Sequence, residues 1–195
     1  MRICLLGWGV NMLLGLSRRQ SMVMVITIGL YLRALAFVGT NDVYNYRSLI
    51  LGVLFITAAI VDLMTYRLPD IFTVGGALLA LILPGGNIID SIKGGLAGLS
   101  IITCIAIASR GGIGGGDIKL SLALGIFLGW PSILLALVLS FWSGGCIGLI
   151  LILTKIKTRT DPIPFGPFLV MGTLATQLWG QELIRWYLTA VWGLY

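Results

Sequence analysis

Charged residues are scarce in this sequence. They make up 10% of its 195 residues, hydrophobic residues make up 58%, and the mean hydropathy is +1.04. A soluble globular domain has about 25% charged residues. So few charges cannot cover a water-facing surface, which excludes a soluble domain of ordinary size. We therefore expect the lipid bilayer to be the main solvent of this chain.

Histidine is absent and cysteine is rare. The three cysteines, Cys4, Cys104 and Cys146, lie in apolar runs and form no CxxC pair. Protein zinc sites are built mainly from Cys and His, so we expect no metal site and no cofactor. Without histidine, a Ser–His or Cys–His catalytic arrangement is excluded as well. The cysteines are interpreted as small apolar packing residues.

The net charge of +6 does not indicate nucleic-acid binding. The basic residues stand in short breaks between apolar runs, without a basic stripe or interleaved aromatic residues. Their distribution is better explained as a topology signal for a protein that contacts membrane lipid.

Apolar segments recur along the chain and predict an all-α, polytopic transmembrane bundle of about eight helices in a single membrane domain, 1–195. Their approximate ranges are 3–16, 20–39, 48–65, 71–84, 92–109, 119–129, 131–154 and 165–180, with a further one at 182–195. The first is interpreted as a retained membrane segment, because Ser17 and two arginines follow it instead of a cleavage site. Small-residue pairs such as Gly94 and Gly98, Gly125 and Gly129, and Gly144 and Gly148 predict close helix packing.

Lysine and arginine are divided unequally between the two sides that alternating segments define. The breaks at 66–70, 110–118 and 155–164 fall on one side, and 85–91 falls on the other. The first side holds eight basic residues and the second holds four. These are Arg18, Arg19, Arg67, Arg110, Lys119, Lys155, Lys157 and Arg159 against Arg2, Arg47, Lys93 and Arg185. The positive-inside rule therefore predicts that the first side faces the cytoplasm.

Seven acidic residues are present, and those near membrane depth are functional candidates because burying a charge there is costly. They are Asp42, Asp62, Asp70, Asp90, Asp117, Asp161 and Glu182. Asp42, Asp90 and Glu182 are interpreted as solvated loop residues of outer breaks. Asp161 is interpreted as structural or peripheral to a site.

Two of the acids lie beside apolar helix ends on the predicted cytoplasmic side. Asp62 ends a long apolar run, where it could also snorkel or pair with Arg67. Asp117 follows a glycine run and could instead be the N-cap of the next helix, or the glycine run could be a flexible loop. A phosphate cradle is not favoured, because no strand precedes the glycines and no Gly-Lys-Ser or Gly-Lys-Thr follows them. Asp70 favours an N-cap role. A pair of carboxylates that shares one proton suits hydrolysis, because one activates water while the other donates a proton.

Three motifs resemble those of the type IV prepilin peptidases. The stretch from Asp62 through Leu68 and Pro69 to Asp70 is similar to their first motif. Gly114, Gly116, Asp117 and Lys119 fit their second, the GxGD signature shared with presenilin-type peptidases. The block 163–168, with Pro164 and Gly166, resembles a third. Together the motifs frame a peptidase core at 48–180.

The resemblance implies that Asp62 and Asp117 are a catalytic pair, with the other motif residues supporting the site or binding substrate. It implies an aspartic endopeptidase of the bacterial inner membrane that removes the short basic leaders of prepilins or pseudopilins at the cytoplasmic face. Many family members carry a CxxC loop and also N-methylate the product. This chain looks like a short form without that loop, so methyltransferase activity is not expected.

Two other functions compete with this interpretation. An ion- or proton-coupled transporter subunit would place acids near the bilayer midplane and often shows an inverted repeat. Neither feature is found in the sequence. A catalytically idle membrane subunit of a pilus or secretion assembly would not need the aspartate pair.

Overall fold

The chain folds into helices throughout the part that the structure, a computed structural model, describes: residues 29, 43–109, 112–156, 158 and 163–192. Six helices lie within these residues. They are α3 (Val43–Thr65), α4 (Asp70–Ile82), α5 (Ile88–Ala108), α6 (Gly115–Leu128), α7 (Ser132–Leu153) and α8 (Gly166–Trp192). Apart from residue 29, the first two apolar segments of the sequence lie outside the described residues, as do Asp42 and Asp161.

Three of the helices are long and apolar enough to cross a membrane. They cover Tyr46–Thr65, Ile88–Ala108 and Ser132–Leu153. Helices α4 and α6, with 13 and 14 residues, are shorter than the roughly 20 residues that a span needs. The helical fold class is confirmed for the described residues, and the total of about eight spanning helices stays a prediction.

Two boundaries differ from those predicted from the sequence. Helix α3 begins at Val43, five residues before the expected segment, so Arg47 lies within the helix and not in a loop. Helix α8 runs without interruption from Gly166 to Trp192, although the sequence predicted a break near Gln181. No proline stands near that position, so the backbone hydrogen bonds continue through the polar residues.

Other local predictions are corrected by the same helices. Asp90 lies in the first turn of α5 and is half-buried, while Glu182 is an exposed residue of α8, so neither is a loop residue. Cys104 and Cys146 are exposed and do not pack in the interior.

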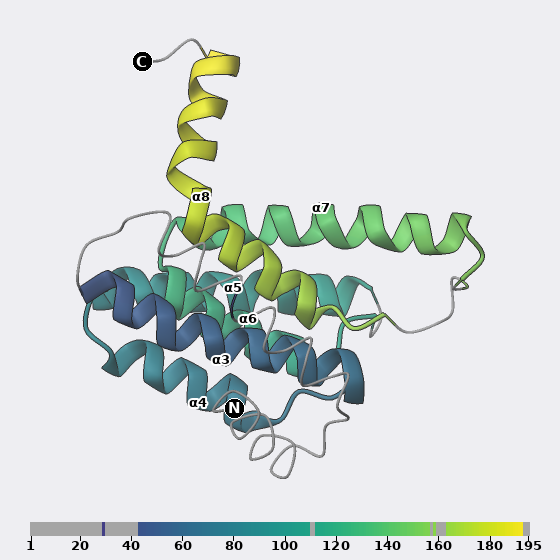
Figure 1. Ribbon diagram of the computed structural model, residues 1–195, viewed down its shortest axis with the longest axis horizontal. Coiled ribbons are helices and arrows are strands. Elements are labelled where there is room, and N and C mark those ends of the chain that lie inside the picture. The colour runs from purple at the N-terminus through teal and green to yellow at the C-terminus, as the bar shows by residue number, and fades with distance from the viewer. Residues whose placement is uncertain (1–28, 30–42, 110–111, 157, 159–162, 193–195) are drawn as a thin grey trace.

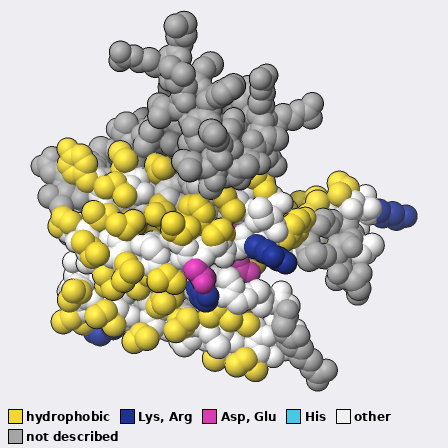
Figure 2. Space-filling model, turned by 90° about the horizontal axis from the view of Figure 1, so that it is seen from below, with side chains coloured by type: hydrophobic (Ala, Val, Ile, Leu, Met, Phe, Trp, Pro, Cys, Tyr) yellow, Lys and Arg dark blue, Asp and Glu magenta, His cyan; other side chains and the backbone are white. Residues whose placement is uncertain are grey.

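Helix α6 lies at the centre of the bundle, with α5 and α4 packed against it and α8 close by (Figure 1). Its side chains Leu120 and Leu124 join Phe55 of α3 and Leu169 of α8 in one buried hydrophobic core. The second half of α8 leaves the bundle and stands apart from it (Figure 1). On the face shown in Figure 2, hydrophobic side chains cover much of the surface, while acidic side chains lie beside basic ones near its middle.

The predicted close approach of helices through glycine is confirmed between α5 and α6. A β-carbon on Gly98 would lie 2.6 Å from the backbone oxygen of Ser121, and one on Gly94 would collide with the backbone oxygen of Gly125. The hydroxyl of Ser121 donates to the backbone oxygen of Gly98 over 3.1 Å. Helix α6 is thereby held firmly against α5, which fixes the position of its first turn.

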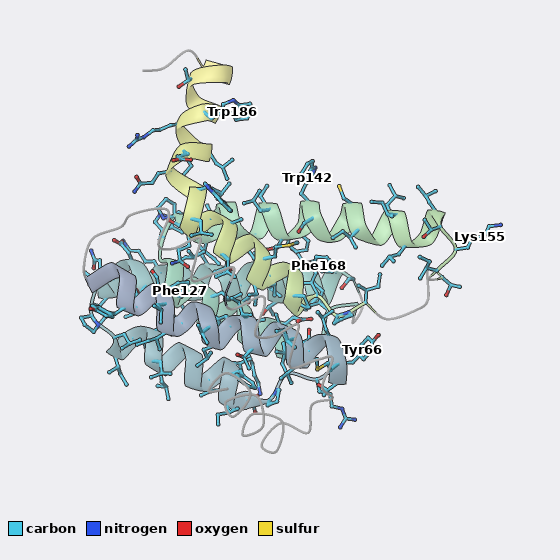
Figure 3. All side chains as sticks on the ribbon, viewed as in Figure 1. Tyr66, Phe127, Trp142, Lys155, Phe168 and Trp186 are labelled. Atoms are coloured by element: carbon cyan, nitrogen blue, oxygen red, sulfur yellow. The ribbon has the colours of Figure 1, made fainter. Side chains whose placement is uncertain are left out.

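Alternating helix directions bring the described residues of the three predicted breaks to one end of the bundle. Helix α3 ends there, α4 and α6 begin there, and α8 returns there with its first residue (Figure 1). Tyr66 and Lys155 mark this end in Figure 3, and Phe127 marks the other. The residues of the three motifs therefore meet within one region.

Candidate active site

Asp62 lies in the last turn of α3, with 5% of its surface exposed. The helix ends three residues later because Tyr66 adopts a left-handed backbone conformation, with φ of 53°, and Pro69 follows. The backbone N–H of Tyr66 donates to the Asp62 carbonyl over 2.8 Å, which closes the last turn. The carboxylate neither snorkels nor forms a salt bridge with Arg67 in the described structure.

Asp117 lies in the first turn of α6, with 8% of its surface exposed. Gly114 is the N-cap of this helix, so the alternative role of Asp117 as N-cap is wrong. The Asp117 backbone N–H donates to the Gly114 carbonyl over 3.1 Å. The aspartate side chain is buried, and the backbone amides of Gly114 and Gly166 lie beside its carboxylate.

Gly166, the first residue of α8, stands against both carboxylates. A β-carbon at this position would lie 2.5 Å from Oδ2 of Asp62 and 3.4 Å from Oδ1 of Asp117. The backbone amide of Gly166 faces both carboxylates. Amides in the first turn of a helix have no partner within the helix, so they are available to bind these oxygens. The structure therefore brings the three motifs together around two acids.

A cavity of about 550 Å³ opens beside the two aspartates. It is lined by Asp62, Tyr66, Arg67, Leu68, Gly112, Gly114, Gly115, Gly116, Asp117, Ile163 and Pro164. Among the described residues, Oδ2 of Asp62 is buried without a hydrogen-bond partner. A buried carboxylate oxygen in this position can accept a hydrogen bond from water or substrate that enters the cavity.

The surroundings of Asp117 favour its protonated form. Asp117 lies in α6, outside the three helices long enough to cross the membrane. Burial, and after it the nearby Asp62 carboxylate, raises the pKa of Asp117 to about 6. The amides of Gly114 and Gly166 act in the opposite direction. Two close carboxylates in a dry site therefore share one proton up to a pH of about 6.

The remaining predicted site residues are close to this cavity, with one corrected role. Pro69 is the N-cap of α4, and Asp70 is the first residue inside the helix, so the predicted N-cap role of Asp70 is wrong. Its carboxylate instead accepts a hydrogen bond from Nζ of Lys119 over 2.7 Å. A Lys–Asp contact across 49 residues has no local sequence signal, so the sequence pattern does not predict it.

Two further residues of the first motif adjoin the pair, although neither was singled out as a site residue from the sequence. Leu68 packs against Gly116, where an added β-carbon would lie 3.1 Å from the β-carbon of Leu68. Tyr66 lines the cavity with a backbone conformation that is uncommon for any residue other than glycine. Leu68 could have been suspected from its place in the first motif, whereas the conformation of Tyr66 depends on the fold.

The described residues contain no group of three or more His, Cys, Asp or Glu side chains that could hold a metal ion. The chemistry that these residues can support by themselves is acid–base chemistry. One carboxylate can take a proton from water while the other donates one to a carbonyl oxygen or leaving amine.

Comparison with known proteins gives a consistent assignment. Residues 49–149 match the type IV leader peptidase family. A prepilin leader peptidase/N-methyltransferase of Aeromonas hydrophila is 34% identical over 151 residues, which cover 73% of this chain and 52% of that protein. A prepilin leader peptidase/N-methyltransferase of Legionella pneumophila is 32% identical over 147 residues, which cover 68% of this chain and 50% of that protein. The chain thus spans about half the length of the curated relatives it matches. No solved structure matches it.

Proposed function

Because the chain belongs to the type IV leader peptidase family, we propose that it is an aspartic endopeptidase that removes the leader peptides of prepilins or prepilin-like proteins. The names of its relatives support prepilins as the substrate class. We further propose that Asp62 and Asp117 are its catalytic pair.

The observation that supports this proposal most directly is the meeting of the two buried aspartates at Gly166. Both carboxylates border one cavity, and an oxygen of each lies within 3.4 Å of a β-carbon built on this glycine. In the proposed reaction, the ionised carboxylate takes a proton from a water molecule as the water attacks the scissile carbonyl carbon. The protonated carboxyl donates its proton to the carbonyl oxygen, and the departing amine is protonated as the carbon–nitrogen bond breaks.

We propose that this chemistry takes place at the cytoplasmic edge of the bacterial inner membrane. The end of the bundle that carries Tyr66 and Lys155 also carries Arg67 and Lys119. The excess of Lys and Arg on this side supports a cytoplasmic orientation. Labelling of single cysteines placed at 112 and 86 tests it, with access expected from the cytoplasm and from outside, respectively. The reverse labelling pattern would contradict the orientation.

The proposed activity is tested by co-expression with candidate prepilins and by cleavage with the purified protein in detergent. Asp62→Asn and Asp117→Asn keep the shape of each side chain but remove its titration. Each is expected to reduce the cleavage rate by about 10²–10⁴-fold, the usual contribution of a proton-transfer group. Membrane levels of each variant serve as the control for folding. Cleavage at close to the normal rate by either variant would contradict the aspartyl mechanism.

Two other functions predict different results in the same experiment. A catalytically idle membrane subunit would leave every prepilin uncut, and a transporter subunit would do so while showing proton or ion flux in vesicles. The relatives are also named N-methyltransferases, and we propose that this chain cleaves without methylating its product. Mass spectrometry of the product N-terminus would show an added methyl group if this part of the proposal were wrong.

A further inference from the structure

An ion pair joins the two chain segments that carry the aspartates. Nζ of Lys119 lies 2.7 Å from Oδ1 of Asp70. Asp70 opens α4 and follows Asp62 by eight residues, and Lys119 follows Asp117 by two residues in the same helix. Few residues along the chain therefore separate each aspartate from its side of the ion pair.

The segment on the Asp70 side of the ion pair has little freedom. Four residues, 66–69, connect α3 to α4. Tyr66 is held at φ of 53° and Pro69 at φ of −63°. Leu68, between them, packs against Gly116, the residue before Asp117. Fixing Asp70 therefore also fixes the end of α3 that carries Asp62.

We propose, on the basis of the function proposed above, that the Asp70–Lys119 ion pair is a positioning device that sets the separation of Asp62 and Asp117. The side chains of Lys119 and Asp70 are 51% and 66% exposed, so the ion pair contributes little to overall stability. The ion pair instead acts on geometry, because it holds together the contact between Leu68 and Gly116. This contact joins the segment after α3 to the start of α6, and we call it the seam. Two carboxylates that act on one water tolerate little displacement, because an error of about 1 Å can cost about 10²-fold in rate.

Breaking and then reversing the ion pair tests this role. Asp70→Asn and Lys119→Met are each expected to lower kcat about fivefold, equivalent to about 1 kcal/mol, with KM unchanged. The double variant Asp70→Lys with Lys119→Asp restores the attraction in the opposite sense and is expected to recover most of kcat. Lys93→Met, which removes an exposed lysine of α5 distant from the seam, is the matched control and should leave kcat unchanged.

Disulfide formation across the seam gives a second measurement that does not depend on cleavage. Leu68→Cys and Gly116→Cys, in a chain whose three native cysteines are replaced by serine, place two β-carbons about 3.1 Å apart. This is close to the distance of about 3.5–4.5 Å that a disulfide requires. Cross-linking should be fast with the ion pair intact, slower with Asp70→Asn, and fast again in the reversed pair.

Several results would overturn the proposal. The proposal would be wrong if neither the cross-linking rate nor kcat changed when the ion pair was broken. It would also be wrong if the reversed pair had a kcat no higher than that of the less active single variant. A rise in KM alone after Asp70→Asn would show that Asp70 binds the basic leader and does not position the aspartates. If the unaltered protein cleaved no prepilin, the proposed function would fail, and the cross-linking rates would still show whether the ion pair holds the seam.

Discussion

Gly166 lies so close to Asp62 that a β-carbon at position 166 would meet Oδ2 of the carboxylate at 2.5 Å. The absence of a side chain lets the first amide of α8 face both aspartates. Pro167 follows Gly166, and because proline has no N–H, it adds no unsatisfied donor to this first turn. The glycine is thus required by the space between two acids and not by its backbone conformation.

Substitution of Gly166 by alanine is expected to reduce cleavage by about 10²-fold, because the new methyl group must displace the Asp62 carboxylate. The initial rate of prepilin cleavage at saturating substrate measures the loss. Gly145→Ala in α7 is the matched control, since a β-carbon there meets no atom within 4 Å. Equal activity of the two variants would mean that the contact with Asp62 is unimportant for catalysis.

The pH dependence of cleavage is expected to follow the proton that the aspartates share. The pKa of Asp117 is raised to about 6 by burial and by the Asp62 carboxylate. As pH rises through this value, the pair loses its proton and with it the acid needed for catalysis. We therefore expect kcat/KM to fall on the alkaline side with an apparent pKa near 6 that belongs to the pair. A rate that stays constant from pH 5 to pH 8 would contradict this assignment.

The same coupling can be measured without substrate. Asp62→Asn removes the neighbouring charge, so the pKa of Asp117 should fall, while burial still holds it above its ordinary value. Infrared spectroscopy of the protonated carboxyl group across a pH titration reports this change directly. An unchanged titration of Asp117 would show that the two acids do not interact.

Close packing of α5 on α6 should be sensitive to a single methyl group. In Gly94→Ala, the new β-carbon would lie 2.6 Å from the carbonyl carbon of Gly129 and would collide with the backbone oxygen of Gly125. Overpacking of this kind costs about 1–3 kcal/mol of folding free energy. Thermal unfolding in detergent measures the loss. Gly75→Ala is the control and should be neutral or slightly stabilising, because no atom lies within 4 Å of its β-carbon.

Arg47 of α3 ties four helices together at the end opposite the aspartates. One terminal nitrogen of its guanidinium donates to the carbonyls of Ala80 and Ile126, in the last turns of α4 and α6, over 3.0 Å and 3.1 Å, and to the hydroxyl oxygen of Ser91 in α5 over 3.4 Å. The side chain is only 7% exposed and lies over the ring of Phe127. It therefore satisfies carbonyls that have no partner within their own helices.

Replacing Arg47 with methionine is expected to lower the free energy of unfolding by about 2–4 kcal/mol, because its charge-assisted hydrogen bonds to Ala80, Ser91 and Ile126 are lost. Asp62 lies fifteen residues further along α3, roughly 22 Å away at 1.5 Å per residue. The folded fraction should therefore cleave with a normal kcat. A loss of kcat at unchanged stability would contradict a purely structural role.

Much of the fold was predictable from local sequence. All six described helices lie on predicted apolar segments, and α8 joins two of them, because a backbone in lipid must satisfy its hydrogen bonds within each helix. The continuity of α8 past Gln181 was not predictable from polarity, since a helix can carry polar residues where it leaves the bundle. Arg47 was expected in a loop because a lone arginine near an apolar run normally marks a boundary.

Composition predicts a membrane protein, and the apolar segments place Asp62 and Asp117 beside helix ends. The link between these aspartates and a peptidase family came from the resemblance of three motifs. The packing of the helices, in contrast, places Gly166 between the two carboxylates and pairs Asp70 with Lys119 instead of leaving it to cap its helix. Both are contacts between residues at least 49 positions apart, and such contacts are set by how helices pack and not by local pattern.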